Sequence, residues 1–159
     1  MSLTVPVGSD HQLARLLQIG VVLEEVVEAR ASKHASDTAD LPDVVRAMLE
    51  DAAEESADHR DRLEDLIDEL DADTVPFEEI EALVEAQYEA DEDFDGVLYD
   101  QLCNEETAYK FYDDLIEAVE ASDVAFGIDR DRLLDTLATI REEEAEGVEE
   151  VAALMEDRR

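Results

Sequence analysis

The chain has 159 residues, and its 47 acidic and 12 basic side chains give a formal net charge of −35. Such an excess of acid excludes nucleic-acid binding through phosphates and disfavours docking on anionic membrane surfaces. No apolar run reaches the roughly 18 residues of a membrane span, and no secretion signal is visible at the N-terminus. We therefore expect one folded cytoplasmic domain with neither nucleic-acid nor membrane partners.

The cysteine content and the choice of arginine over lysine further restrict the kinds of protein that this chain can be. A single cysteine, Cys103, excludes an internal disulfide framework and a rubredoxin-type iron centre. Hydrophobic residues make up 45% of the chain, too many for a disordered acidic tail. Lysine occurs only at Lys33 and Lys110, and this composition is similar to that of cytoplasmic proteins of salt-adapted archaea, where salt screens surface repulsion. The alternative is an acidic surface that recruits a basic partner or mimics nucleic acid.

Helical periodicity of apolar residues runs through the first half of the chain. Residues 1–9 are expected to be a disordered tail or a cloning remnant, and the folded bundle to cover residues 10–159. A first helix is predicted from Asp10 to Ala35, because Ser9 and Asp10 supply capping chemistry. A second is predicted from Pro42 to Leu70, with the proline in its first turn.

The second half repeats this arrangement. After Pro76, which disfavours helix at the preceding residue, a short helical piece is predicted from Phe77 to Ala90. Two further long helices follow, the third from Phe94 to Ala121 and the fourth from Asp129 to Glu156. Strand patterns are nearly absent, so the fold class is all-α.

The lengths of the connections predict how the helices are arranged. Short loops join the helices of each pair, whereas the middle connection, about residues 71–93, is long. A helix of about 26 residues is roughly 39 Å long, so this connection has the length of a crossover between two hairpins. One long crossover between two hairpins is the connectivity of a ferritin-like four-helix bundle. An elongated coiled coil is the alternative, although Pro76 and Gly127 interrupt its heptads.

Three acidic segments resemble a known family. Residues 105–112 read Glu-Glu-Thr-Ala-Tyr-Lys-Phe-Tyr, which resembles the Glu-x-x-Ala-x-x-Phe-Tyr stretch of the rubrerythrin-like branch of the ferritin-like superfamily. Residues 52–63 and 140–148 resemble that family's Ala-Glu-Glu-Glu-x-x-His segments. The similarity covers about residues 10–157 and includes no rubredoxin domain.

The resemblance implies a dinuclear iron or manganese centre held by carboxylates and histidine. Its ligands would be Glu24, His59, Glu105 and Glu144, with Glu105 as the bridging carboxylate. Ser56 and Gly147 stand where the family has a glutamate and a histidine. The missing carboxylate can be replaced by Glu55, which lies four residues before His59 on the same helical face. Water, Glu143 or Glu146 is left to fill the remaining position.

The resemblance also implies a function. It predicts an oxidoreductase that reduces oxygen or peroxide or oxidises ferrous iron and receives electrons from a separate donor. Apart from the resemblance, we expect the bundle to form a homodimer. The alternative is a non-catalytic binding or structural bundle that has lost its metal, because two expected ligands are absent. Tyr112, seven residues after Glu105, either fills the core or donates a hydrogen bond near the centre, and we favour the core position.

Overall fold

The computed structural model describes residues 6–76, 78–80, 82 and 96–157, and over these residues the protein is a bundle of helices with no strand. This confirms the all-α fold class. Along the same residues, no helix has both the length and the apolar character that a membrane crossing requires. The long helices are α1 (Asp10–Asp37), α2 (Asp43–Glu69), α4 (Val97–Glu120) and α5 (Arg130–Asp157).

The helix ends follow local chemistry and lie close to the predicted positions. Ser9 is the N-cap of α1, and its hydroxyl accepts a hydrogen bond of 3.1 Å from the backbone N–H of Gln12. Pro42 lies at the N-cap of α2 rather than inside its first turn. Gly96, with a φ of 114°, precedes α4 in a backbone conformation that favours glycine. The predicted start at Phe94 lies outside the described residues.

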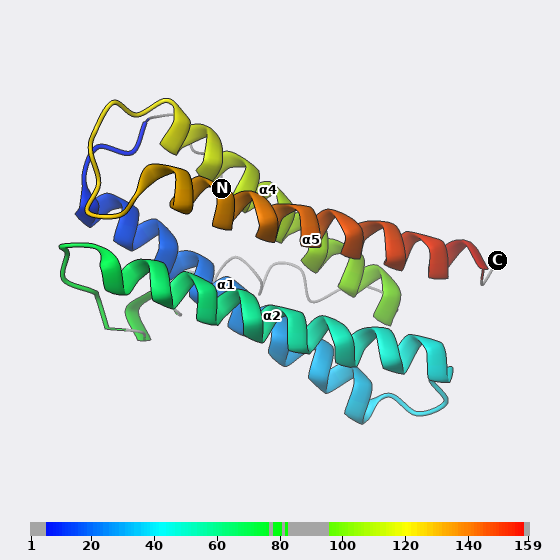
Figure 1. Cartoon of the computed structure of the whole chain (residues 1–159). Helices are drawn as coiled ribbons and strands as arrows, with labels where there is room; N and C mark the ends of the chain where they lie inside the picture. The colour runs from blue at the N-terminus through cyan, green and yellow to red at the C-terminus, as the bar shows by residue number, and fades with distance from the viewer. Residues whose placement is uncertain (1–5, 77, 81, 83–95, 158–159) are drawn as a thin grey trace.

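The helices form two antiparallel pairs, α1 with α2 and α4 with α5 (Figure 1). Each pair is closed by a short loop and packs mainly within itself, while α1 also contacts α4 and α2 contacts α5. α2 ends at the end of the bundle where α1 begins, whereas α4 begins at the opposite end (Figure 1). Residues 70–96 therefore connect opposite ends of the bundle. Of the short helix predicted from Phe77 to Ala90, the described residues 78–80 and 82 are helical, and the others lie outside the described residues.

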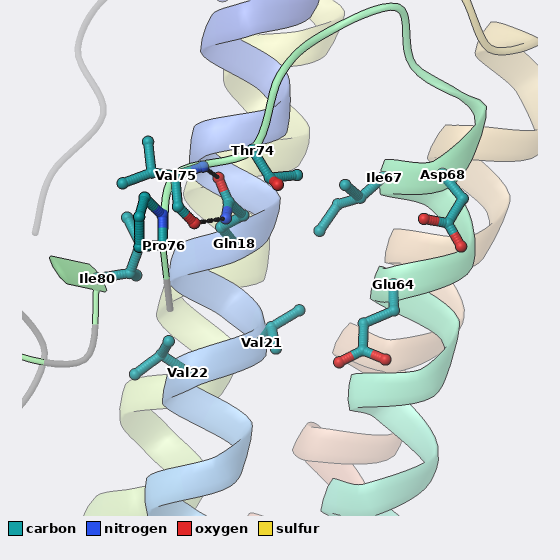
Figure 2. Close-up of a pocket in the computed structure, with 10 residues that line it drawn as sticks. All are labelled: Gln18, Val21, Val22, Glu64, Ile67, Asp68, Thr74, Val75, Pro76 and Ile80. Carbon is teal, nitrogen blue, oxygen red and sulfur yellow. Dashed lines mark hydrogen bonds between the residues drawn. The ribbon is translucent and has the colours of Figure 1, made fainter. Parts of the chain in front are cut away.

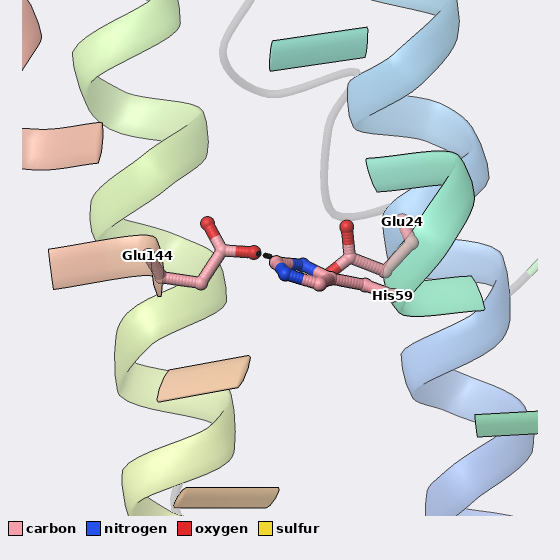
Figure 3. Close-up of side chains that lie close together, drawn as sticks. All are labelled: Glu24, His59 and Glu144. Carbon is pink, nitrogen blue, oxygen red and sulfur yellow. Dashed lines mark hydrogen bonds and ion pairs between the residues drawn. The ribbon is translucent and has the colours of Figure 1, made fainter. Parts of the chain in front are cut away.

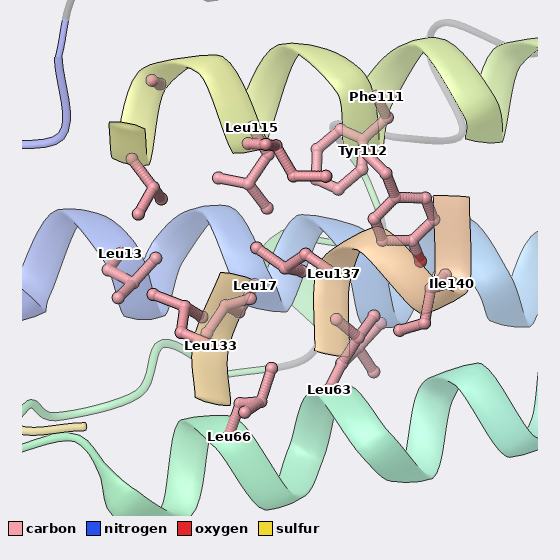
Figure 4. Packing of buried hydrophobic residues seen from close by; sticks show 14 of the residues in the cluster. Leu13, Leu17, Leu63, Leu66, Phe111, Tyr112, Leu115, Leu133, Leu137 and Ile140 are labelled. Atoms are coloured by element: carbon pink, nitrogen blue, oxygen red, sulfur yellow. The ribbon is translucent and has the colours of Figure 1, made fainter. Parts of the chain in front are cut away.

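One end of the bundle interior is a continuous apolar core contributed by all four helices (Figure 4), and a smaller apolar cluster around Ala31, Val45 and Leu49 lies at the other end. The predicted apolar stripes of the helices supply it, because residues three and four apart share one helical face. Tyr112 packs edge to face against Phe111, with ring centroids 5.2 Å apart. The largest fully buried apolar side chains of this core are Leu13, Leu17, Leu63, Leu66, Leu115, Leu133, Leu137 and Ile140.

The chain segments at this apolar end are joined by polar contacts. The carboxylate of Asp10 accepts hydrogen bonds from the backbone N–H groups of Asp71 and Gly127, at 3.2 and 3.0 Å. Val7 lies in the segment expected to be a tail, yet it is only 3% exposed and its N–H donates to Ala118 at 3.2 Å. Residues 1–5 lie outside the described residues.

A hollow of about 530 Å³ lies between α1, the end of α2, residues 74–76 and Ile80 (Figure 2). Gln18 on α1 holds its rim by pairing with the backbone of Val75, donating at 2.8 Å and accepting at 3.2 Å. Its walls mix apolar and polar side chains, with the carboxylates of Glu64 and Asp68 on the α2 side (Figure 2). It contains none of the histidine or glutamate residues predicted as ligands.

Candidate metal centre

Three helices bring buried ligand-type side chains together in the middle of the bundle (Figure 3). Glu24 comes from α1, His59 from α2 and Glu144 from α5, and one nitrogen or oxygen atom of each lies within 4.8 Å of the others. Their exposed fractions are 0%, 0% and 3%. Each lies on the inward face of its helix, so the apolar periodicity that builds the core also directs these polar groups inward.

His59 is the hub of the cluster, because both ring nitrogens face carboxylates. Nδ1 lies 3.0 Å from Glu144 Oε1 and 3.3 Å from Glu24 Oε1. Nε2 lies 2.6 Å from Glu143 Oε2 and 3.7 Å from Glu55 Oε1. Carboxylates on both sides favour an imidazolium that donates from both nitrogens.

The two ring nitrogens define two ligand groups that share one histidine. We call Glu24, His59 and Glu144 the inner group, and Glu55, His59 and Glu143 the outer group. The side chains of Glu55 and Glu143 are 39% and 31% exposed, whereas the inner carboxylates are buried. The outer group therefore faces solvent between α2 and α5, and the inner group does not.

Helix α4 contributes a further carboxylate, Glu105, which is 7% exposed. Its Oε1 accepts a hydrogen bond of 2.9 Å from Gln101 Nε2. Interaction with Glu144 and with Gln101 lowers the pKa of Glu105, but burial outweighs both and raises it. Glu105 belongs to neither ligand group.

Gly147 explains how Glu105 fits against α5. A Cβ atom on Gly147 would lie 2.6 Å from Glu105 Oε2 and 2.7 Å from its Cδ, which is closer than such atoms approach. The carboxylate of Glu105 therefore occupies the space that a side chain at position 147 would fill.

Tyr112 on α4 contacts the inner group from the one long helix that contributes no member to it. The residue is fully buried, and its hydroxyl donates a hydrogen bond of 2.6 Å to Glu24 Oε1. Burial and the adjacent Glu24 raise the pKa of the Tyr112 hydroxyl well above its usual value, so it remains a donor. Tyr112 thus fills the core and also donates to the centre, the two roles that the sequence left as alternatives.

Burial and neighbouring carboxylates change the pKa values of the ionisable side chains at this centre. Burial on its own lowers the pKa of His59, but the hydrogen bond and charge of Glu24, with Glu143 and Glu55, outweigh it and raise the pKa to about 9. Burial raises the pKa of Glu55 to about 7 against the opposing charge of His59. Burial and then the charge of Glu24 raise the pKa of Glu144, and burial raises that of Glu105. The centre therefore holds more carboxyl groups than its one histidine can neutralise, so the buried carboxyls favour their protonated form.

The donor set suits a divalent metal ion. Carboxylate oxygen is preferred by manganese, and imidazole nitrogen suits iron and zinc. Among the described residues, Glu24 Oε2 and Glu55 Oε1 are buried atoms that accept no hydrogen bond. A buried acceptor without a partner is costly, and a cation supplies that partner. The inner and outer groups each offer one such oxygen.

All five residues predicted as ligands lie at this centre, but they do not form one shell. Glu24, His59 and Glu144 share the inner group, Glu55 joins only the outer group, and Glu105 lies behind Glu144. Ser56 is buried at 4% exposure beside them and supplies no carboxylate. The sequence weighed Glu143 only as one way to fill a gap, whereas it makes the shortest contact to His59.

Comparison of the chain with protein-family models, curated proteins and solved structures found no match.

Proposed function

We propose that this protein binds a divalent metal ion, iron or manganese, at the inner group of the bundle. The observation that carries the proposal is the buried Glu24–His59–Glu144 cluster, in which Glu24 Oε2 has no hydrogen-bond partner among the described residues. Burying carboxylates costs free energy unless protons, partners or a cation compensate. Because each of the three residues lies on a different helix, the folded bundle sets their spacing before an ion arrives.

We further propose that the fold is ferritin-like and its ancestry rubrerythrin-like. Two antiparallel pairs joined by a segment that connects opposite ends of the bundle support the first part (Figure 1). The segments around His59, Glu105 and Glu144 support the second part. The proposed iron chemistry is reduction of oxygen or peroxide, or oxidation of ferrous iron, with a separate electron donor.

In that proposal the residues of the chain have distinct tasks. A redox-active ion at the inner group supplies the electron-transfer chemistry. Glu24, His59 and Glu144 hold the ion, while Tyr112 orients Glu24 through its hydroxyl. Gln101 orients Glu105, which contacts Glu144 and places a proton-accepting carboxylate beside the inner group. The apolar core on one side limits access of water.

A second candidate function is a non-catalytic helical bundle that no longer uses metal. The specific observation in its favour is that His59 already pairs with carboxylates at both nitrogens, at 3.0 Å and 2.6 Å. A charged histidine with such partners satisfies much of the buried charge by itself.

Metal loading distinguishes the two candidates. The purified protein is loaded with Mn²⁺, or with Fe²⁺ without oxygen, and its metal content is measured by elemental analysis beside Glu24→Gln and Glu25→Gln. Glu25 is exposed on the same helix and loses the same charge, so it is the matched control. We expect metal in the wild type and in Glu25→Gln, and a strong loss in Glu24→Gln. Equal content in all three proteins, or none in any, would favour the non-catalytic bundle.

A further inference from the structure

The inner and outer groups differ in how easily a hydrated ion can reach them. The inner carboxylates of Glu24 and Glu144 are 0% and 3% exposed. The outer carboxylates of Glu55 and Glu143 are 39% and 31% exposed, and both lie on the α2–α5 side of the bundle. An ion that approaches from solvent on this side therefore meets the outer group first. Half-exposed carboxylates also let the ion keep part of its water shell, which lowers the cost of the first contact.

The imidazole of His59 is the element that the two groups share. Nε2 faces the outer carboxylates and Nδ1 faces the inner ones. A neutral imidazole has one nitrogen lone pair for a metal, because the other nitrogen carries a proton. The two groups therefore use His59 alternately, and one ion occupies one group at a time.

The surroundings of the outer group show what an arriving ion must displace. Arg62 Nη1 lies 3.8 Å from Glu143 Oε1, and Nη2 pairs with Asp58 at 2.9 Å. Arg62 also lines a polar hollow of about 300 Å³ between α2 and α5. Its long contact to Glu143 is weak, whereas Glu55 Oε1 is buried and accepts no hydrogen bond within the described part of the chain. The outer group thus offers an oxygen that accepts no hydrogen bond, beside a cation that can be displaced.

We propose that the outer group of Glu55, His59 and Glu143 is a loading site, which captures a divalent cation from solvent and passes it to the inner group through His59. This inference rests on the proposed metal binding and adds the direction from which the ion arrives. In the transfer the ion leaves His59 Nε2 and the carboxylates of Glu55 and Glu143 for His59 Nδ1 and the carboxylates of Glu24 and Glu144. The proton on Nδ1 is released and Nε2 takes up a proton in its place, so the imidazole stays neutral and no oxidation state changes. Because the final site is the inner group, the outer carboxylates affect the rate of binding more than the amount bound.

Stopped-flow binding of Co²⁺, followed by its visible absorption, tests this assignment. The double variant Glu55→Gln with Glu143→Gln is compared with Glu54→Gln with Glu142→Gln. The control removes the same charge from neighbouring positions of the same two helices, where both side chains are exposed. We expect the outer-group variant to bind about tenfold more slowly than the control, because local carboxylates concentrate and capture the cation. Its final stoichiometry should equal that of the wild type.

Each other outcome has a definite meaning. Equal association rates in the two double variants would overturn the loading role while leaving the inner site in place. A loss of stoichiometry as large as that of Glu24→Gln would also overturn it, because Glu55 and Glu143 would then be permanent ligands. No Co²⁺ bound by the wild type would reject the proposed metal binding itself, and the loading site with it. Thermal melting of each variant shows that the bundle is folded before the rates are compared.

Discussion

Two neighbouring regions of the bundle interior are built on the same four helices but from opposite kinds of side chain. Towards the start of α1 the interior is filled by leucines such as Leu13, Leu17 and Leu133. One to two turns further along the same helices it holds Glu24, His59 and other buried polar groups. The first part gains free energy by removing apolar surface from water, and the second loses free energy by burying charge. The contrast indicates that the apolar end stabilises a polar centre which is kept for another reason.

The largest effect should come from the apolar end. Leu137→Ala removes a fully buried side chain and leaves a cavity, so we expect the free energy of unfolding to fall by about 3 kcal/mol. Leu134→Ala makes the same change at a partly buried position of the same helix, so we expect it to lower the free energy of unfolding by less. Urea unfolding followed by circular dichroism measures both. Metal content should not change in either variant, and a loss of metal in Leu137→Ala would show that the two parts are not separable.

A smaller effect is expected for Tyr112→Phe, at the boundary between the two parts. The change keeps the packing but removes the hydroxyl that donates to Glu24 at 2.6 Å. A hydrogen bond to a charged group contributes about 2 kcal/mol, so unfolding should become easier by roughly that amount. Tyr109→Phe is the control, because Tyr109 is 39% exposed, and it should change stability by less than about 0.5 kcal/mol. Equal effects in the two variants would contradict the role assigned to Tyr112.

Gly147→Ala tests the packing of the polar centre and should have a smaller effect on stability. The new methyl group would displace the Glu105 carboxylate, which we expect to cost about 1 kcal/mol net of the gain in helix propensity. In a Glu105→Ala background the same change should instead stabilise the protein by about 1 kcal/mol, since only the propensity remains. A double-mutant cycle of unfolding free energies measures this coupling. Additive effects would mean that Glu105 does not occupy the space beside Gly147.

The pH dependence of the metal-free protein should be the most gradual of these effects. The pKa of Glu55 is raised to about 7, so folding favours its protonated form and stability falls as the pH rises from about 4.5 through 7. The pKa of His59 is raised to about 9, so its contribution is complete below about 6.5 and is lost as the pH rises through 9. Each proton contributes at most about 1.4 kcal/mol per pH unit.

Both shifts therefore predict that the metal-free protein is less stable at pH 9.5 than at pH 6. Thermal melting across this range measures the trend, and His59→Gln should flatten its upper part. Metal binding has the opposite dependence, because an ion displaces the protons of its ligands and binds more tightly as the pH rises. Stability that rises with pH in the metal-free protein would contradict the assigned protonation of the centre.

Much of this arrangement could be predicted from the sequence because it depends on helical period. The stripes that contain Leu17, Leu63 and Leu137 identify the inward face of each helix, and the same period places Glu24, His59 and Glu144 on it. The helix ends were predicted within three residues wherever the structure describes them, since capping residues such as Ser9 mark them. The all-helical bundle is confirmed on these grounds.

What the sequence could not supply depends on how the helices are rotated against one another. Glu143 and Glu144 are adjacent in an acidic run, yet one belongs to the outer group and the other to the inner group on opposite sides of one imidazole. The Glu105 carboxylate of α4 occupies the space beside Gly147 of α5, where any other residue would have a side chain. No pattern within a single helix reveals this contact between two helices.

The division of the bundle into two hairpins has a consequence for how the centre forms. Contacts within α1–α2 and within α4–α5 are local in sequence, so each hairpin can close early in folding, and their association comes later. Glu24 and His59 belong to the first hairpin, and Glu144 to the second. The centre therefore exists only in the associated state, and an ion at a hundred times its dissociation constant would stabilise that state by about 2.7 kcal/mol. Such an ion would act mainly by slowing the separation of the hairpins, which would make metal a determinant of the protein's lifetime as well as of its chemistry.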